Sequence, residues 1–295
     1  MTLDQLRIFV AVAERGHLTK AAEVLSLTPS AVSASIRVLE ERYGTALFDR
    51  VGRGIELNEA GRSFLPEARS TLASARATEM TLAELGIGKR GTLHMQASQT
   101  IASYWLPPLL VRFHQTYPLV AIDLAISNTQ SVARAVIEGT TEIGFVEDGV
   151  NEAMLSSTPF GEDHFALVVA PGHPWADGAP VAPSALLSGE WVMREQGSGT
   201  RSAFEVMLAA VGIDSTDLNV ALTLPSNESV RAAVKAGPYA TVMSSLVVAA
   251  DIQAALLCEV NIALPPRSFY LLRHASRYKS RASLAFEQLI RRNHA

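Results

Sequence analysis

Small polar side chains and a single cation share one face of a predicted helix over residues 29–43. The inward face of this helix is apolar, with Val32, Ile36 and Leu39 at helical spacing. The opposite face carries the groups that could do chemistry: Ser30, Ser33, Ala34 and Arg37. Hydroxyls and a guanidinium on a slim helix suit hydrogen bonding to bases and phosphates in the major groove of DNA. Small residues would also suit packing against protein, so this face alone leaves both interpretations open.

A glycine- and hydroxyl-rich turn precedes another predicted helix, whose apolar residues begin at Phe204. The turn consists of Gln196, Gly197, Ser198, Gly199, Thr200 and Arg201. Free backbone N–H groups and the positive end of a helix dipole bind anions, and Arg201 could add its charge. We therefore expect a carboxylate, phosphate or sulfate group to bind here. The alternative is an ordinary flexible, capped turn.

Polar residues also follow the predicted strands of the same region. In open α/β sheets, ligands bind outside the carboxyl ends of the strands. The residues at these ends are Ser98, Gln99, Thr100, Ser127, Asn128, Thr129, Glu147 and Asp148. Ser98 and Thr100, at the start of a predicted helix, offer anion-binding chemistry from across a cleft. We therefore predict a small, anionic metabolite as the ligand.

The remaining polar residues predict no catalytic or metal chemistry. No pair of histidines has the helical spacing of metal ligands. No nucleophile elbow, Walker loop or glycine fingerprint for nucleotides occurs in the sequence. The lone Cys258 excludes a disulfide within the chain and a cysteine-based metal cluster. We expect no enzyme activity, no cofactor and no metal site.

The composition is that of an ordinary globular protein. The 295 residues are 48% hydrophobic and 18% charged, with a formal net charge of −4. This length predicts two or three domains. The negative charge excludes a wholly basic nucleic-acid binder, but it allows a small DNA-binding module on an acidic body. With one cysteine, no basic-then-apolar leader and no apolar run of membrane length, we expect a cytoplasmic protein without a membrane partner.

Three helices and a hairpin are predicted to position the polar face described first. A helix over about residues 3–13 precedes a pair of helices over 18–25 and 29–43, which together predict a helix-turn-helix. Thr28 suits the N-cap of the second helix, Pro29 its first position, and Tyr43 its last inward apolar position. Residues 47–57 predict a two-stranded wing, which could place Arg50 and Arg53 against phosphates. An exposed charged turn is the alternative.

These segments resemble the DNA-binding domain of the LysR-type transcriptional regulators over residues 1–61. The matching motifs are LRIFVAVAE (6–14), LTKAAEVL (18–25), SAVS (30–33), IRVLE (36–40), LFDR (47–50) and LNEAG (57–61). The resemblance implies that DNA is contacted by Thr28, Ser30, Ala31, Ser33, Arg37, Arg50 and Arg53. Pro29 stands where the family usually has Gln, and Ala34 where it often has Arg. Both positions commonly meet DNA, so Pro29 joins the predicted interface, but the preferred base sequence does not carry over.

A long, alanine-rich helix is predicted over residues 59–85, with Asn58 as its cap. Heptad spacing relates Leu65, Ala68, Leu72, Ala75 and Leu82, although Glu79 interrupts one core position. A helix of this length with so narrow an apolar stripe needs a partner to pack against. The family resemblance implies that the partner is the same helix of a second copy, which makes a dimer. Pro66 should kink the helix or displace its first turn. We therefore assign 1–58 to a DNA-binding domain and 59–90 to a linker helix and hinge.

From residue 92 the pattern changes to alternating strands and helices, which predicts an α/β fold with parallel sheets. Residues 91–295 resemble the two-lobed, periplasmic-binding-protein-like effector domain of the same family. The resemblance rests on the strand order and on VVAPGHPW (168–175) and REQGSGTR (194–201). It implies a first lobe of about 91–165 with 267–295 and a second of about 166–266. The family's Gly-x-Gly before a late strand is replaced by GPYA (237–240), so the shape of the neighbouring cleft wall does not carry over.

These features predict a LysR-type regulator that binds double-stranded DNA as a homodimer or homotetramer. A small anion in the cleft between the lobes is expected to modulate DNA binding or activation, and an interaction with RNA polymerase is compatible with this role. Two alternatives stay open. One is a metabolite-processing enzyme with an appended DNA-binding domain, against which the lack of a nucleophile–base set weighs. The other is a constitutive repressor without an effector.

Overall fold

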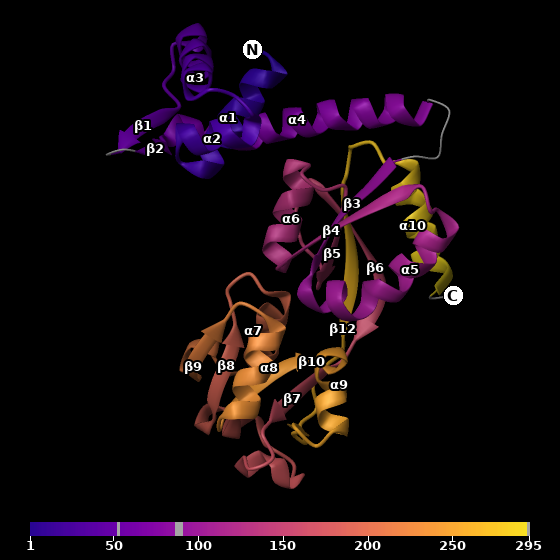
Figure 1. The fold of residues 1–295 in the computed structure, drawn as a ribbon. Coiled ribbons are helices and arrows are strands. Elements are labelled where there is room, and N and C mark those ends of the chain that lie inside the picture. Colours follow the sequence, from indigo (N-terminus) through magenta and orange to yellow (C-terminus); the bar gives the residue numbers. More distant parts are fainter. Residues whose placement is uncertain (52–53, 86–90, 294–295) are drawn as a thin grey trace. The chain divides into compact units, whose positions relative to one another are not determined.

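The chain divides into two compact units in the computed structural model, which describes residues 1–51, 54–85 and 91–293 (Figure 1). One unit comprises Met1–Gly86 with Ile137–Thr140, and the other comprises Ile87–Val136 with Thr141–Ala295. Arg53 and residues 86–90 of the predicted hinge lie outside the described residues. Each unit has its own hydrophobic core and is described by itself.

The first unit is a winged helix-turn-helix followed by a long helix, as predicted. Its elements are α1 (Leu3–Arg15), α2 (Leu18–Leu25), α3 (Pro29–Tyr43), β1 (Phe48–Val51), β2 (Gly54–Leu57) and α4 (Glu59–Leu85). The strands β1 and β2 pair antiparallel. The core is centred on Phe9, whose ring packs against those of Phe48 and Phe64. Burying each such aromatic side chain stabilises the unit by about 1.5–3 kcal/mol.

Local sequence explains where these helices begin and end. The Thr28 hydroxyl caps α3 by accepting a hydrogen bond from the Ala31 N–H at 3.2 Å, with Pro29 in the first turn. Asn58 caps α4, because its side-chain oxygen accepts from the Gly61 N–H at 2.9 Å. The helix α4 continues through Pro66 as one element. The prediction that Tyr43 faces inward is wrong: this last residue of α3 is 57% exposed, because α3 extends past the core there.

The first half of α4 packs on its own unit. Ala68 and Leu72 are buried in the core with α1, and Leu65 packs against its edge. A Cβ at Gly61 would lie 2.1 Å from the Leu47 carbonyl oxygen, so only glycine allows this close approach of α4. The expectation that all five heptad residues face a partner chain is therefore revised. Ala68 and Leu72 have little surface left, whereas Leu82 is 66% exposed.

The second unit contains two lobes, each a five-stranded sheet between layers of helices (Figure 1). The first-lobe sheet has the order β4-β3-β5-β12-β6. Its strands are β3 (Gly91–Ser98), β4 (Val120–Ser127), β5 (Ile143–Glu147), β6 (Leu155–Asp163) and β12 (Arg267–His274). A π-helical turn (Ile101–Trp105), α5 (Leu106–Thr116) and α10 (Arg281–Asn293) cover one face, and α6 (Thr129–Glu138) covers the other.

The second-lobe sheet has the order β11-β7-β10-β8-β9. Its strands are β7 (Phe165–Val169), β8 (Glu190–Arg194), β9 (Asn219–Leu224), β10 (Ala240–Ser244) and β11 (Cys258–Glu259). One face is covered by α7 (Gly199–Ala210) and the other by α8 (Asn227–Ala236) and α9 (Ser245–Gln253). The chain passes into this lobe between Asp163 and Phe165 and returns before Arg267.

The predicted parallel sheets are in fact mixed. In the first lobe β3 pairs parallel with β4 and β5, but β12 runs antiparallel to β5 and β6. In the second lobe β10 pairs parallel with β8 and antiparallel with β7. The antiparallel members are the strands that join the two lobes or lie next to those that do. A chain that crosses between two sheets and comes back must reverse direction, which alternation of strands and helices does not reveal.

Candidate functional site

The outer face of α3 presents every predicted DNA-contacting residue of the helix-turn-helix to solvent. Val32, Ile36 and Leu39 are buried against α1 and α2, and this burial fixes the rotation of α3. The exposed residues are Thr28, Pro29, Ser30, Ala31, Ser33 and Arg37. The face therefore offers the exposed hydroxyls of Ser30 and Ser33, of which that of Ser30 lies 3.0 Å from the Thr28 hydroxyl, and the guanidinium of Arg37.

The charges on this face are free to change partners. The Arg37 Nε lies 3.7 Å from the Glu41 carboxylate, and the two side chains are 72% and 67% exposed. Because an exposed ion pair of this kind contributes little, the guanidinium can leave Glu41 for a phosphate or a base edge. Arg50 is exposed on β1 of the wing. The wing is attached to the helices where the Ile55 N–H donates to the Gly16 carbonyl at 3.2 Å.

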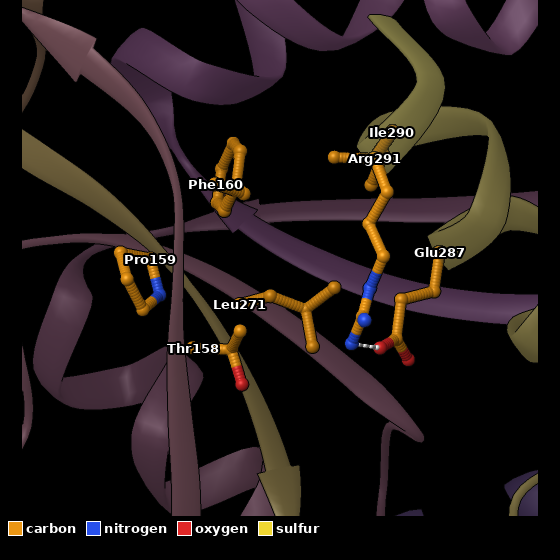
Figure 2. A pocket seen from close by; sticks show the side chains of 7 residues that line it. All are labelled: Thr158, Pro159, Phe160, Leu271, Glu287, Ile290 and Arg291. Carbon is orange, nitrogen blue, oxygen red and sulfur yellow. Dashed lines mark hydrogen bonds and ion pairs between the residues drawn. The ribbon is translucent and has the colours of Figure 1, made fainter. Parts of the chain in front are cut away.

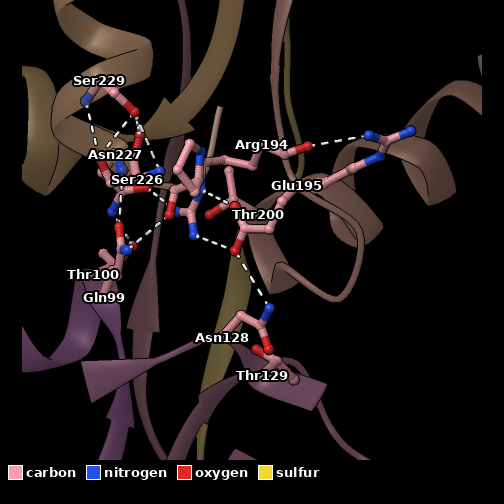
Figure 3. A network of polar contacts seen from close by, with 12 residues as sticks. Gln99, Thr100, Asn128, Thr129, Arg194, Glu195, Thr200, Ser226, Asn227 and Ser229 are labelled. Atoms are coloured by element: carbon pink, nitrogen blue, oxygen red, sulfur yellow. Dashed lines mark hydrogen bonds and ion pairs between the residues drawn. The ribbon is translucent and has the colours of Figure 1, made fainter. Parts of the chain in front are cut away.

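The strand ends of the second unit form the other candidate site, where the two lobes face each other. Gln99 and Thr100 follow β3 in the first lobe and contact Asn227, at the start of α8 in the second lobe (Figure 3). The Asn227 side chain donates to the Thr100 hydroxyl at 3.1 Å, and its backbone N–H donates to Gln99 Oε1 at 2.8 Å. Asn227 and Thr100 are almost fully buried. These contacts form one wall of the polar region between the two lobes, which is called the cleft here.

The opposite wall joins the start of α6 to the predicted anion-binding turn. The Gln130 N–H donates to the Gly197 carbonyl at 3.2 Å, and Asn128 donates to the Glu195 carboxylate at 3.4 Å. A Cβ at Gly199 would lie 2.6 Å from the Thr129 hydroxyl and 2.8 Å from the Glu147 carboxylate. The first turn of α7 therefore meets a carboxylate of the chain itself, at the place where an external anion was predicted.

Arg194, the last residue of β8, lies between these two walls (Figure 3). Its guanidinium forms a two-point contact with the Glu195 carboxylate, at 2.8 Å from Nε and 3.0 Å from Nη2. Its Nη1 donates to the Asn227 side-chain oxygen. Arg194 is only 5% exposed. A buried guanidinium is thus presented to the cleft with its planar edge occupied by an adjacent carboxylate.

A second buried arginine, Arg267, contacts residues of both lobes at the base of the cleft. The Arg267 side chain donates to Asp163 at 2.8 Å and contacts the Thr200 hydroxyl at 3.4 Å. Asp163 also accepts from the Ser244 hydroxyl at 2.7 Å, and its side chain is fully buried. Burial raises the pKa of the nearby Asp148, with the Arg267 charge opposing that rise. The positive charge of Arg267 is therefore satisfied by internal carboxylates.

Several predicted ligand-binding residues stand apart from this network. The Arg201 guanidinium donates to Glu205 at 2.8 Å and to the Arg194 carbonyl at 3.1 Å, both within the second lobe. Ser98 and Ser198 are buried at the strand end and the turn. The Ser98 hydroxyl is buried and has no hydrogen-bond partner among the described residues.

Sequence reasoning missed four members of the network: Arg194, Glu195, Asn227 and Arg267. The strand-end rule applied to β9 would have found Asn227, because Ser226 and Asn227 come directly after that strand. Arg194 is itself the end of a predicted strand. Arg267 opens β12, and since β12 is antiparallel to β5, its first residue lies at the carboxyl edge of the sheet. No pattern in the sequence signals that reversal.

A separate pocket lies on the first lobe, between β6, β12 and α10 (Figure 2). It has a volume of about 330 Å³ and is lined by Thr158, Pro159, Phe160, Leu271, Glu287, Ile290 and Arg291. Its rim carries an ion pair between Glu287 and Arg291 at 2.7 Å. None of the predicted ligand-binding residues lines it.

The described residues hold no cluster of three or more histidine, cysteine, aspartate or glutamate side chains suited to a metal ion. Among the helices of the described chain, none is both long and apolar enough to span a membrane. A winged helix-turn-helix joined by a long helix to a two-lobed α/β unit, with polar strand ends facing each other, defines a class of protein. That class is the DNA-binding transcriptional regulator with an effector-binding domain.

Comparison with known proteins identifies the family. The model of the bacterial regulatory helix-turn-helix protein, lysR family, matches residues 3–62, and that of the LysR substrate binding domain matches residues 86–295. The uncharacterised HTH-type transcriptional regulator YeiE of Escherichia coli is 34% identical over 97% of this chain and 96% of its own length. The chain belongs to the LysR family of transcriptional regulators, so it is a regulator and not an enzyme.

Solved structures of similar fold include both DNA-bound and ligand-bound proteins. Full-length CbnR in complex with its target DNA has a TM-score of 0.70 at 21% identity, covering 99% of both chains. The CcmR regulatory domain of Synechocystis in complex with 2-PG has a TM-score of 0.64 at 25% identity, covering 69% of this chain and 97% of that domain.

Proposed function

We propose that this regulator reads DNA through Ser30, Ser33 and Arg37 of α3 and is controlled by a small oxyanion bound between the lobes of its second unit. The observation that carries the DNA part is the exposed polar face of α3, held in place by the buried Val32, Ile36 and Leu39. Thr28, Pro29, Ala31 and Arg50 extend this face, and Arg53 is a further candidate from the sequence.

The oxyanion is supported by the chemistry of the cleft. Hydroxyl, amide and guanidinium groups from both lobes lie in one network there: Gln99, Thr100, Asn128, Thr129, Arg194 and Thr200. The hydroxyls of Ser98 and Ser198 are buried at the adjoining strand end and turn. The similar CcmR domain was solved with 2-PG. Control further requires that the oxyanion bind two forms of the regulator with different affinity, since equal affinity would not shift the equilibrium between the two forms. Binding of DNA as a homodimer through α4, and contact with RNA polymerase, complete the proposal.

The DNA interface is tested by two substitutions. Ser33→Ala and Arg37→Ala should each weaken binding to the operator by roughly tenfold, about 1.4 kcal/mol, because each removes a donor from the exposed face. Fluorescence anisotropy with labelled DNA measures the affinity. Arg7→Ala is the matched control, since Arg7 is an exposed arginine of α1 that pairs with Asp4. Unchanged affinity in both α3 variants, with unchanged melting temperature, would remove this interface.

A further inference from the structure

The ion pair between Arg194 and Glu195 supports a further inference. This inference rests on the proposed control of the regulator by a small oxyanion. Neighbouring residues at the end of a strand form a two-point ion pair, with contacts of 2.8 and 3.0 Å. The two partners differ in burial: the Arg194 side chain is 5% exposed and that of Glu195 is 26% exposed. Glu195 can therefore rotate into water, whereas Arg194 has to keep an anion beside it.

The other cations near the cleft are held differently. Arg267 pairs with Asp163, whose side chain is fully buried, so neither partner can leave without stranding a charge. Arg201 pairs with Glu205 along α7 and donates to the Arg194 backbone carbonyl, so both its partners belong to the second lobe. The first turn of α7 lies against the Glu147 carboxylate, which would repel an incoming anion. Of the two buried arginines between the described lobes, Arg194 has a carboxylate partner that reaches water, whereas the partner of Arg267 does not.

The geometry of the Arg194 contact specifies the chemistry of what can replace Glu195. A guanidinium edge with two parallel N–H groups binds two oxygens of one group, which carboxylate, phosphate and sulfate all provide. The Nη1 contact with Asn227 can persist during such an exchange, because it uses the remaining side of the guanidinium. One carboxylate is replaced by another oxyanion, and the charge beside Arg194 stays balanced.

We propose that Glu195 is a built-in competitor: its carboxylate occupies Arg194 until a small oxyanion displaces it. The displacement also has a consequence across the cleft. Glu195 Oε1 accepts a hydrogen bond from Asn128 of the first lobe at 3.4 Å, so its departure removes that link. The link on the other wall, from Asn227 to Thr100 at 3.1 Å, remains. Oxyanion binding thus loosens one wall of the cleft and leaves the other in place.

Titration of the full chain with inorganic phosphate tests the competition. The Glu195→Gln variant lacks the competing charge but keeps a side-chain oxygen for Asn128. Calorimetry should show that this variant binds phosphate at least about tenfold more tightly than the wild type. Glu205→Gln is the matched control, because it removes the charge partner of Arg201, and it should match the wild type. Adding Arg194→Lys to the Glu195→Gln variant should abolish the gain, since lysine has no two-point edge.

Three results would overturn the proposal: equal phosphate affinity in Glu195→Gln and the wild type, a gain that survives Arg194→Lys, or an equal gain in Glu205→Gln. If Glu195→Gln does not fold, Glu195→Asp, which keeps the charge but shortens the reach, should give a smaller gain in the same titration. This readout is independent of DNA. An affinity gain without any effect of oxyanions on DNA binding would overturn the proposed control and leave the competition intact.

Discussion

Asp148 occupies a strained position directly after β5, at a φ of +65°. Burial raises the pKa of its carboxyl group; the Arg267 charge lowers it, and the charges of Glu147 and Asp163 raise it further. An unfolded chain therefore loses this proton first, at about the ordinary value of 3.8. As pH rises above that value, the folded state loses stability relative to the unfolded chain, because the Asp148 carboxyl group ionises less readily in the folded state.

Asp148→Asn should therefore raise the melting temperature at neutral pH, because it removes the disfavoured charge while asparagine still tolerates a positive φ. The gain should disappear below pH 3.8, where the aspartate is protonated in both states. Calorimetry across this pH range measures the change in melting temperature, which is about 2–4 °C for each kcal/mol of stability in a unit of this size. A gain that is largest in acid, or absent at neutral pH, would contradict this assignment.

At the strand ends that were visible in the sequence, the predicted residues lie close together, and their binding of a ligand stays a prediction. Gln99, Thr100, Asn128 and Thr129 follow predicted strands and lie in the network between the lobes. Arg201, also predicted as a ligand-binding residue, pairs with Glu205, which lies one helical turn further along α7. Arg194 ends a strand and Arg201 lies in the first turns of α7, and the different partners of the two side chains depend on contacts that the sequence pattern does not reveal.

At the scale of elements, α4 carries the proposed dimer. Its first half is committed to its own unit, because Leu72 is 7% exposed and packs in the core. Leu72→Asp would therefore unfold the unit and say nothing about dimerisation. Leu82, at 66% exposure, is the heptad position that can be charged without cost to the fold.

Leu82→Asp should raise the dimer dissociation constant by at least roughly tenfold, about 1.4 kcal/mol, because an aspartate would be buried against the partner helix. Sedimentation equilibrium measures the change, and the melting temperature of the monomer should stay constant. Leu256→Asp is the control, since Leu256 is a leucine of the second lobe that is 51% exposed. An undiminished mass for Leu82→Asp would contradict the role of α4.

Elements with a strong hydrophobic period were predictable, and those without one were not. The bounds of α2, α3 and α4 agree with the sequence pattern and its caps. The strand β6 was missed because it is an edge strand with mostly exposed or half-buried residues and a proline at 159, so it shows no apolar alternation. Its antiparallel pairing with β12 then escaped prediction too, since both depend on contacts distant in sequence.

At the scale of the whole molecule, the formal charge of −4 is compatible with DNA binding because attraction to phosphate is local. A protein that uses a few cations, such as Arg37 and Arg50, should lose affinity with added salt in proportion to that small number of phosphate contacts. The acidic remainder disfavours non-specific binding. In the proposed mode of binding, specific recognition comes from α3 and from two copies bound to one site.

The most direct test is footprinting of the full-length protein on the DNA beside its own gene, with and without a pool of small oxyanions that includes inorganic phosphate and 2-PG. We expect protection of a site with dyad symmetry, and we expect the protected region to lengthen or shorten when the pool is added. A site protected identically in both conditions would contradict oxyanion control and favour a constitutive regulator. No protection by the folded protein would contradict the proposed DNA interface itself.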